Sequence, residues 1–236
     1  GTREADPSLP NIIFILDNTS NWARQSQGWP GGLQQGQSEV RAIKNTFAEL
    51  NDQVNVGIME YITGGNSADN NAGYVRFHLQ ELTEDIHDEF DNSLDKIFDD
   101  IDEPIEKRDS SNPYGDLPWD FYNYLSGGQH SNSGAGTPVT DSWNGTTVNM
   151  ADPDAYTSQW NVFNSPLGSL DICADTYLIF IGNNVNGDIA GDDTTNSNAL
   201  RAAYAAAGKT APDALAGDNS GEPLTLYEFE LEERTI

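Results

Sequence analysis

Apolar residues occur along the chain in two patterns, short continuous runs and stripes at helical spacing. The run NIIFILD over residues 11–17 ends in an acid and a polar stretch, as is typical of a strand buried on both faces. Residues 38–50 follow a helical pattern, with Ser38 as the expected N-cap. One face of that helix carries the apolar residues Val40, Ile43, Phe47 and Leu50. The chain is therefore expected to begin with a strand followed by an amphipathic helix.

The same alternation continues through most of the sequence. Further strands are predicted over residues 54–61, 74–79, 175–181 and 224–231, and further helices over 83–101, 117–125 and 199–207. The strand at 74–79 is expected to pair with the strand at 54–61 through a turn rich in Gly, Asn, Asp and Ser. Strands that alternate with helices predict a single α/β domain over residues 1–236, with a doubly wound sheet covered by helices on both faces.

Residues 126–160 interrupt this pattern. About half of them are Gly, Ser, Asn or Thr, which predicts a long loop insertion. The stretch also contains Trp143, Tyr156 and Trp160. Two interpretations are open: the aromatic side chains fold back and cover the sheet edge, or they form an adhesive surface among small polar residues.

Charge and composition exclude several classes of function. The 236 residues include 11 Lys and Arg against 38 Asp and Glu, which gives a net charge of −27. Such a chain is repelled by a phosphate backbone and by anionic membranes, so neither nucleic-acid binding nor charge-driven membrane binding is expected. No apolar run is long enough to span a bilayer. The only cysteine is Cys173, which excludes an intrachain disulfide and a cysteine zinc site.

The sequence contains no recognised catalytic motif. His78 falls in a predicted strand, His87 on an acidic helix face and His130 in the long loop. No nucleophile elbow, phosphate-binding loop or dinucleotide fingerprint is present. A phosphatase of the haloacid dehalogenase type would need a second aspartate two residues after Asp17, where this chain has Thr19. The chain is therefore not expected to be an enzyme.

The loop after the first strand reads DNTSN over residues 17–21 and resembles the DxSxS loop of von Willebrand factor A domains. In that family the loop forms a metal-ion-dependent adhesion site at the carboxyl edge of the sheet. The resemblance implies a Mg²⁺ or Ca²⁺ site with Asp17, Thr19 and Asn21 as ligands, where Asn21 replaces a hydroxyl with an amide. Carboxylates, hydroxyls and waters are the ligands that hard divalent cations prefer.

Longer stretches extend the resemblance over about residues 11–184. QSEVRAIKNTFAEL (37–50), VNVGIMEY (54–61) and GYVRFHLQELT (73–83) resemble the first helix and the second and third strands of von Willebrand A domains. NPYGDLPWDFYNYLSGG (112–128) and NSPLGSLDICADTYLIFIGNN (164–184) resemble stretches of PilY-type proteins, the adhesins associated with type IV pilus tips. A von Willebrand A fold is therefore expected, similar to the N-terminal domain of PilY-type proteins.

The remaining ligands implied by the resemblance depart from the family pattern. Asn112, before Pro113, aligns with the family's threonine, and Thr137 in GAGTP is a rival for the same position. Asn183 stands where the family has an aspartate. The site therefore has one certain carboxylate, and it either binds a divalent cation or is vestigial and held by hydrogen bonds.

A second loop also carries oxygen side chains. The oxygen side chains of residues 184–193 are those of Asn184, Asn186, Asp188, Asp192 and Asp193. Two interpretations are open: these residues form a calcium-binding loop, or they form a polar surface loop.

The function implied by the resemblance is adhesion or pilus-tip assembly, outside the cell or at its surface. The expected partners are proteins, either pilus subunits or a surface ligand. The alternative is a structural surface subunit with a vestigial metal site that acts by packing against neighbouring chains. A third hypothesis is a phosphotransfer or hydrolytic enzyme that uses Asp17.

Overall fold

The computed structural model describes most of the predicted sheet and its helices. The described residues are 8–23, 29–62, 73–103, 105–106, 116–130, 141–143, 146–148, 150–158, 160–168, 174–182, 193–208 and 229–230. Within these ranges, side chains are described except for residues 20, 21, 116, 141–143, 146–148, 193–197, 200, 229 and 230.

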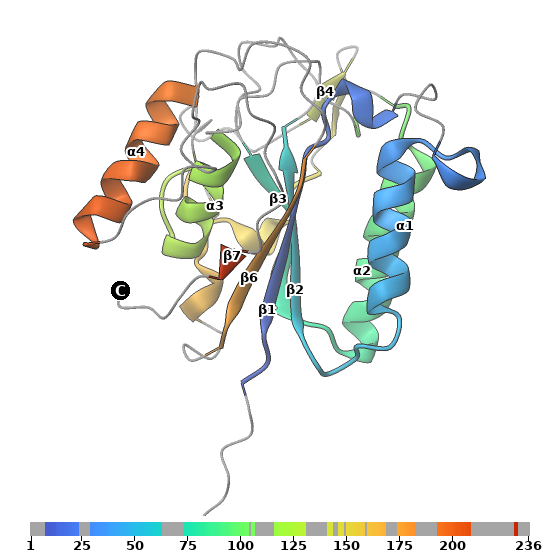
Figure 1. The fold of residues 1–236 in the computed structure, drawn as a ribbon, viewed down its shortest axis with the longest axis horizontal. Coiled ribbons are helices and arrows are strands. Elements are labelled where there is room, and N and C mark those ends of the chain that lie inside the picture. The colour runs from blue at the N-terminus through green and yellow to red at the C-terminus, as the bar shows by residue number, and fades with distance from the viewer. Residues whose placement is uncertain are drawn as a thin grey trace, which may run out of the picture.

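The centre of the molecule is a mixed β-sheet with the strand order β3-β2-β1-β6-β7 (Figure 1). Its strands are β1 (Asn11–Leu16), β2 (Asn55–Tyr61), β3 (Gly73–Glu81), β6 (Thr176–Ile181) and β7 (Phe229–Glu230). β1 pairs in parallel with β2 and β6, whereas β3 and β7 pair antiparallel with their neighbours. Leu16 lies level with Glu60 and Ile181, so the carboxyl ends of the three parallel strands meet at one edge. The α/β class and the pairing of the second and third strands are confirmed.

Two amphipathic helices pack on one face of the sheet, α1 (Gln35–Phe47) and α2 (Glu84–Asp99) (Figure 1). Their apolar residues meet Phe14 and Leu16 of β1 in one buried cluster. α2 begins after Thr83, whose side chain accepts a hydrogen bond from the backbone of Ile86, as expected for an N-cap. α1 begins before Ser38, because the backbone N–H of Gln34 donates to the Gln37 side chain and closes a turn there.

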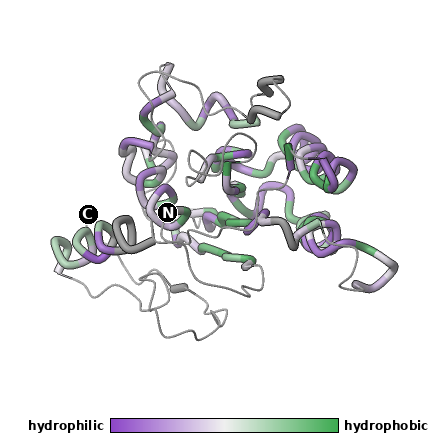
Figure 2. The backbone as a smooth tube through the Cα atoms, turned by 90° about the horizontal axis from the view of Figure 1, so that it is seen from above, coloured by the Kyte–Doolittle hydropathy of each residue, from purple (hydrophilic) through white to green (hydrophobic). Residues whose placement is uncertain are grey.

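A different set of segments packs against the opposite face. Ile13 and Ile15 of β1 contact a second buried cluster that includes α3 (Asp116–Ser126) and residues between 150 and 163. α4 (Asp193–Ala206) contacts α3 and begins six residues before the predicted start at 199. Viewed from above, hydrophobic segments run through the middle of the molecule, while hydrophilic residues are frequent on the helices (Figure 2). β1 is therefore apolar on both faces because it is covered on both.

The stretch predicted as a long loop contains regular structure. β4 (Asp141–Trp143) and β5 (Thr146–Val148) form an antiparallel hairpin, and η4 (Pro153–Ala155) is a 3₁₀ turn with Asp152 as its N-cap. Tyr156 is only 3% exposed, and Trp160 packs against the same cluster. These two side chains cover the sheet, as the first interpretation of the aromatics predicted. The side chain of Trp143 lies outside the described residues.

Short 3₁₀ turns complete the described elements: η1 (Ser20–Ala23), η3 (Pro30–Gly32) and η5 (Pro166–Gly168). Of the helices that the structure describes, none combines the length and the apolar character needed to cross a membrane.

Candidate functional site

Asp17 lies directly after β1, at the carboxyl edge of the sheet. From this edge the chain continues through α1 to β2 on one side of β1, whereas β6 lies on the other side. In open α/β sheets, a crevice for ligands forms where the strand order reverses in this way. The Asp17 backbone N–H donates to the carbonyl of Ile181 at 3.0 Å, so the loop remains attached to the end of β6. We call residues Asp17, Asn18 and Thr19 the β1 edge.

Hydrogen bonds hold the β1 edge in one conformation. Asp17 and Thr19 are 1% and 2% exposed, and the Thr19 backbone N–H donates to Asp17 Oδ1 at 3.2 Å. The Asn18 side chain donates to the Tyr61 carbonyl and accepts from the Tyr61 N–H, both at 3.0 Å. These two bonds continue the pairing of β1 with β2 through a side chain. The loop is therefore fixed between β2 and β6 before any ligand arrives.

The next turn packs tightly against α1. Trp22 is fully buried, and its indole lies over Gly36 in the first turn of α1. A Cβ atom at Gly36 would lie 2.5 Å from the Trp22 ring, so only glycine permits this close approach. η1 thus connects the β1 edge rigidly to α1.

Glu39 of α1 adds a carboxylate near the β1 edge. Trp22 Nε1 donates to Glu39 Oε2 at 2.7 Å, and Gln35 Nε2 donates to Oε1 at 2.8 Å. Burial raises the pKa of Glu39 to about 7 despite these two hydrogen bonds, and the negative charge of Asp17 contributes to the rise. Two acids therefore repel each other at the site. The sequence analysis missed Glu39, because in a chain with 38 acids its position on a helix carries no distinguishing signal.

A buried charge cluster adjoins the β1 edge on the other side. Arg76 of β3 contacts Glu60 of β2 at 3.1 Å and makes a bidentate contact with Glu106 at 2.5 and 3.0 Å. The Tyr74 hydroxyl donates to Glu60 Oε2 at 2.7 Å. Burial is the main cause that raises the pKa of Glu60, and Arg76 opposes it. Asn18 Nδ2 also reaches the Glu106 carbonyl at 3.4 Å, so this cluster supports the β1 edge.

The structure brings together two of the five predicted metal ligands, Asp17 and Thr19. The backbone of Asn21 lies in η1, and its side chain is outside the described residues. The other two ligands and the rival residue also lie outside the described residues: Asn112, Asn183 and Thr137. Of the second candidate loop, Asp193 is the first residue of α4. The rest of that loop, including Asn184, Asn186, Asp188 and Asp192, is outside the described residues.

The chemistry of the β1 edge fits a hard divalent cation. Asp17 offers a carboxylate and Thr19 a hydroxyl, which are both oxygen ligands, whereas the Asn18 amide is engaged with the Tyr61 backbone. A carboxylate has about four lone-pair sites, so the bond from the Thr19 N–H leaves Asp17 able to bind a cation as well. Asp17 and Thr19 would hold the ion, and its charge would offset the repulsion between Asp17 and Glu39.

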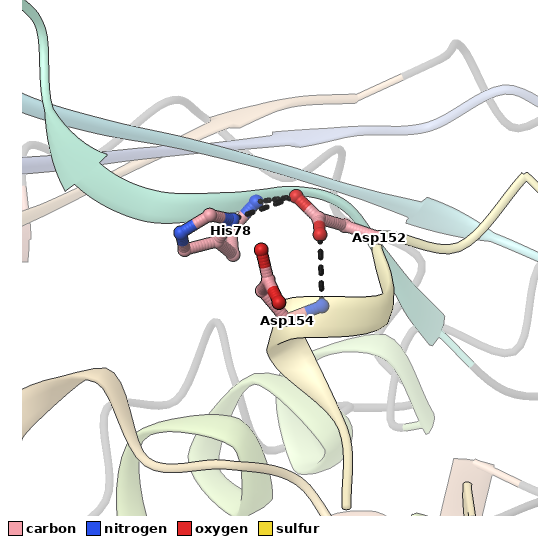
Figure 3. A group of neighbouring side chains, drawn as sticks. All are labelled: His78, Asp152 and Asp154. Atoms are coloured by element: carbon pink, nitrogen blue, oxygen red, sulfur yellow. Dashed lines mark hydrogen bonds and ion pairs between the residues drawn. The ribbon is translucent and has the colours of Figure 1, made fainter. Parts of the chain in front are cut away.

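A second group of ligand atoms lies away from this edge. His78 of β3 meets Asp152 and Asp154 at the start of η4 (Figure 3). The sequence analysis placed His78 in a strand without a partner. His78 and Asp152 are 74 positions apart, so no local spacing could have connected them.

Comparison with known proteins found no matching family model, no matching curated protein and no matching solved structure.

Proposed function

We propose that this chain is a von Willebrand A-type binding domain that serves in adhesion or pilus-tip assembly outside the cell. It engages a protein partner at the β1 edge and carries out no catalysis. One observation carries this proposal: a buried carboxylate, Asp17, lies with Thr19 at the point where the strand order of an α/β sheet reverses.

The positions of the family-like stretches support the assignment. They coincide with β1, α1, β2 and β3, with α3, and with β6, in the order in which the resemblance expects them. On this assignment the sheet is doubly wound, and α1 and α2 cover one face while α3 covers part of the other. The PilY-type assignment rests on the stretches at 112–128 and 164–184, which lead into α3 and β6.

The proposed site binds Mg²⁺ or Ca²⁺ through Asp17 and Thr19. A carboxylate from the partner completes the coordination of the ion, so binding of the partner requires the cation. Burial is the main cause that raises the pKa of Glu39, and the charge of Asp17 adds to it, so a cation at Asp17 would lower that pKa.

A structural role is the second candidate, and the hydrogen bonds at the β1 edge favour it. Asn18 is paired with Tyr61, and Asp17 accepts from Thr19, so the loop keeps its shape without an ion. On this account the site is vestigial, and the domain acts by packing against neighbouring chains.

Thermal unfolding with and without divalent cations separates the two candidates. An ion that binds only the folded state stabilises it by about 2.7 kcal/mol at a hundredfold excess over its Kd. MgCl₂ or CaCl₂ should raise the Tm of the wild type above its value in NaCl of equal ionic strength. Matched NaCl is essential because screening alone stabilises a chain of charge −27. Asp17→Ala should abolish the specific increase.

Asp95→Ala is the matched control, because Asp95 is an exposed acid on α2 that pairs with Lys44. This variant should keep the full increase. If the divalent cations do no more than NaCl, the cation site is refuted and the structural role remains. Hydrolysis of an aryl phosphate by the wild type that is lost in Asp17→Asn would refute the non-enzymatic proposal itself.

A further inference from the structure

Three side chains from two distant segments converge at β3, which is an edge strand of the sheet. They are His78, Asp152 and Asp154, and their ligand atoms all lie within 4.8 Å of one another (Figure 3). His78 Nδ1 lies 2.8 Å from Asp152 Oδ2. We call these three residues the β3–η4 site.

Backbone hydrogen bonds position each member of the β3–η4 site. The backbone N–H of Asp152 donates to the Val75 carbonyl, and the backbone N–H of His78 donates to Asp152 Oδ2, both at 2.9 Å. Asp152 Oδ1 accepts from the backbone of Asp154 at 3.0 Å, which forms the cap of η4. The three side chains are therefore held in place by the fold, and little ordering remains for a ligand to impose.

The donor set is one imidazole nitrogen with two carboxylates. Imidazole suits Zn²⁺ and its transition-metal neighbours, whereas Mg²⁺ and Ca²⁺ prefer oxygen ligands alone. Two ligand atoms about 2.0–2.1 Å from a zinc ion, at the tetrahedral angle that zinc prefers, lie about 3.3 Å apart. His78 Nδ1 and Asp152 Oδ2 are 2.8 Å apart, which is a hydrogen-bond distance, so the two atoms would separate by about half an ångström to bind one ion.

The electrostatic environment favours a cation at the same place. Burial alone would lower the pKa of His78, but the hydrogen bond that its ring donates to Asp152 and the charges of Asp152, Asp154 and Glu89 raise it above its usual range. Burial alone would raise the pKa of Asp152, yet its hydrogen bonds with His78 lower it. The surroundings therefore stabilise positive charge on the imidazole, and a metal ion can take the place of its proton.

The site is also open to solvent. The side chains of His78 and Asp152 are 25% and 15% exposed, and Asp154 is exposed. Water can therefore reach an ion and fill its remaining positions. His130 offers a contrast, since it is 1% exposed and its Nε2 contacts the Gly73 carbonyl.

From these observations we infer that His78, Asp152 and Asp154 bind one Zn²⁺ or a similar borderline divalent cation, which joins η4 to β3. This site differs from the β1 edge in position as well as in chemistry. His78 lies between Phe77 and Gln80, which pair with Ile58 and Val56 of β2, whereas Asp17 follows Leu16, which pairs with Glu60. The two sites therefore lie at different levels of the sheet.

Isothermal titration calorimetry of the full chain with ZnCl₂ tests this inference. The titration is done at physiological ionic strength, which weakens binding by dispersed surface carboxylates. The wild type should bind one Zn²⁺ tightly, and His78→Gln and Asp154→Asn should each weaken that binding by about tenfold or more. His78→Gln keeps the backbone bond to Asp152, and Asp154→Asn changes an exposed side chain, so both variants should fold.

His87→Gln is the matched control. His87 is also a partly buried histidine near an acid, Asp91, but it lies on α2 and belongs to no group of three such ligands in the part of the chain that the structure describes. This variant should bind Zn²⁺ like the wild type. Mg²⁺ should not displace Zn²⁺, and a visible absorption band of bound Co²⁺ should be present in the wild type and absent in His78→Gln. Equal Zn²⁺ affinity in the wild type and both site variants, or a loss in His87→Gln as large as in His78→Gln, would overturn the inference.

Discussion

The β1 edge and the β3–η4 site both gather acidic side chains, but in opposite environments. At the β1 edge, Asp17 is 1% exposed and lies beside a second acid, Glu39. At the β3–η4 site the acids are partly open to water and surround a histidine. The first site offers oxygen ligands in a closed setting, and the second offers mixed ligands in an open one. Burial and ligand type together therefore predict different cations for two sites on one sheet.

The two sites also differ in how they are built. The β1 edge is formed by consecutive residues at the end of a strand, held by Asn18 against β2. The β3–η4 site exists only because the segment around Asp152 packs on β3. A change in supporting contacts should therefore affect one site and spare the other.

The largest loss of stability is expected from Arg76→Met, which removes the guanidinium group from the buried charge cluster that adjoins the β1 edge. Glu60 and Glu106 would then be two fully buried carboxylates without their guanidinium partner. Loss of one partner from a buried ion pair costs about 3–5 kcal/mol. Urea unfolding should show this loss of stability, and the loss should be smaller at low pH, because the raised pKa of Glu60 favours its protonation.

Lys44→Met is the control for that experiment. Lys44 pairs with Asp91 and Asp95 on the surface, where its side chain is 33% exposed. Removal of an exposed ion pair should cost less than about 1 kcal/mol. Equal losses in the two variants would mean that the cluster beneath the β1 edge contributes no more than a surface pair.

A smaller effect is expected from Tyr156→Phe, which acts on the side of the β3–η4 site. The Tyr156 hydroxyl accepts a hydrogen bond from the backbone of Val75 at 2.9 Å. In the variant the buried Val75 N–H loses its hydrogen-bond acceptor, which lowers the stability by about 1–3 kcal/mol. Urea unfolding should show this loss, whereas Tyr122→Phe, at a side chain that is 39% exposed, should have almost no effect.

Zn²⁺ titration sharpens the result for Tyr156→Phe. Because Val75 also accepts from the backbone of Asp152, Zn²⁺ affinity should fall in this variant while the response to Mg²⁺ stays unchanged. A loss of the Mg²⁺ response together with Zn²⁺ affinity would show that the two sites are not independent.

The smallest effect is expected from Glu39→Gln and depends on pH. The pKa of Glu39 is raised to about 7 in the folded protein from 4.5, so the folded state binds more protons than the unfolded state between those values. Stability should therefore fall as the pH rises from 4.5 through 7. Glu39→Gln should reduce this loss of stability by about 1 kcal/mol. The expected change is smaller than the full pKa shift would give, because the Glu39 side chain is partly exposed.

Thermal unfolding from pH 4 to 8 checks this prediction, with Glu49→Gln on an exposed part of the chain as the control. Mg²⁺ bound at Asp17 should also lower the pKa of Glu39 and flatten the wild-type profile. A profile for Glu39→Gln that parallels the wild type would contradict the raised pKa.

Much of the fold was accessible from local patterns. The run at 11–17 predicted β1, and the helical pattern at 83–101 predicted α2, because each pattern matches the period of its element. Boundaries were less accurate where tertiary contacts decide them. α1 begins at Gln35 since Gln34 and Gln37 close its first turn and Gly36 fits beneath Trp22.

The stretch at 126–160 shows the limit of composition. Gly, Ser, Asn and Thr predicted a loop, yet Ala151, Ala155 and Tyr156 are buried there. A few apolar residues are enough to order this stretch when each one fills a space between α3 and the sheet. Such a segment gains its order from packing and therefore has no periodic signal in the sequence.

The sequence by itself determined the strand that precedes Asp17, the helices α1 and α2, and the neighbouring oxygen side chains of Asp17 and Thr19. These features are local, because strand and helix periods and a loop after a strand involve residues close together in the chain. Only the tertiary structure decided which charges became partners. Arg76 meets Glu106 across 30 positions, and His78 meets Asp152 across 74. In a chain with 38 acids, any of them could have been the partner, and only the packing of β3 against its neighbours selects one.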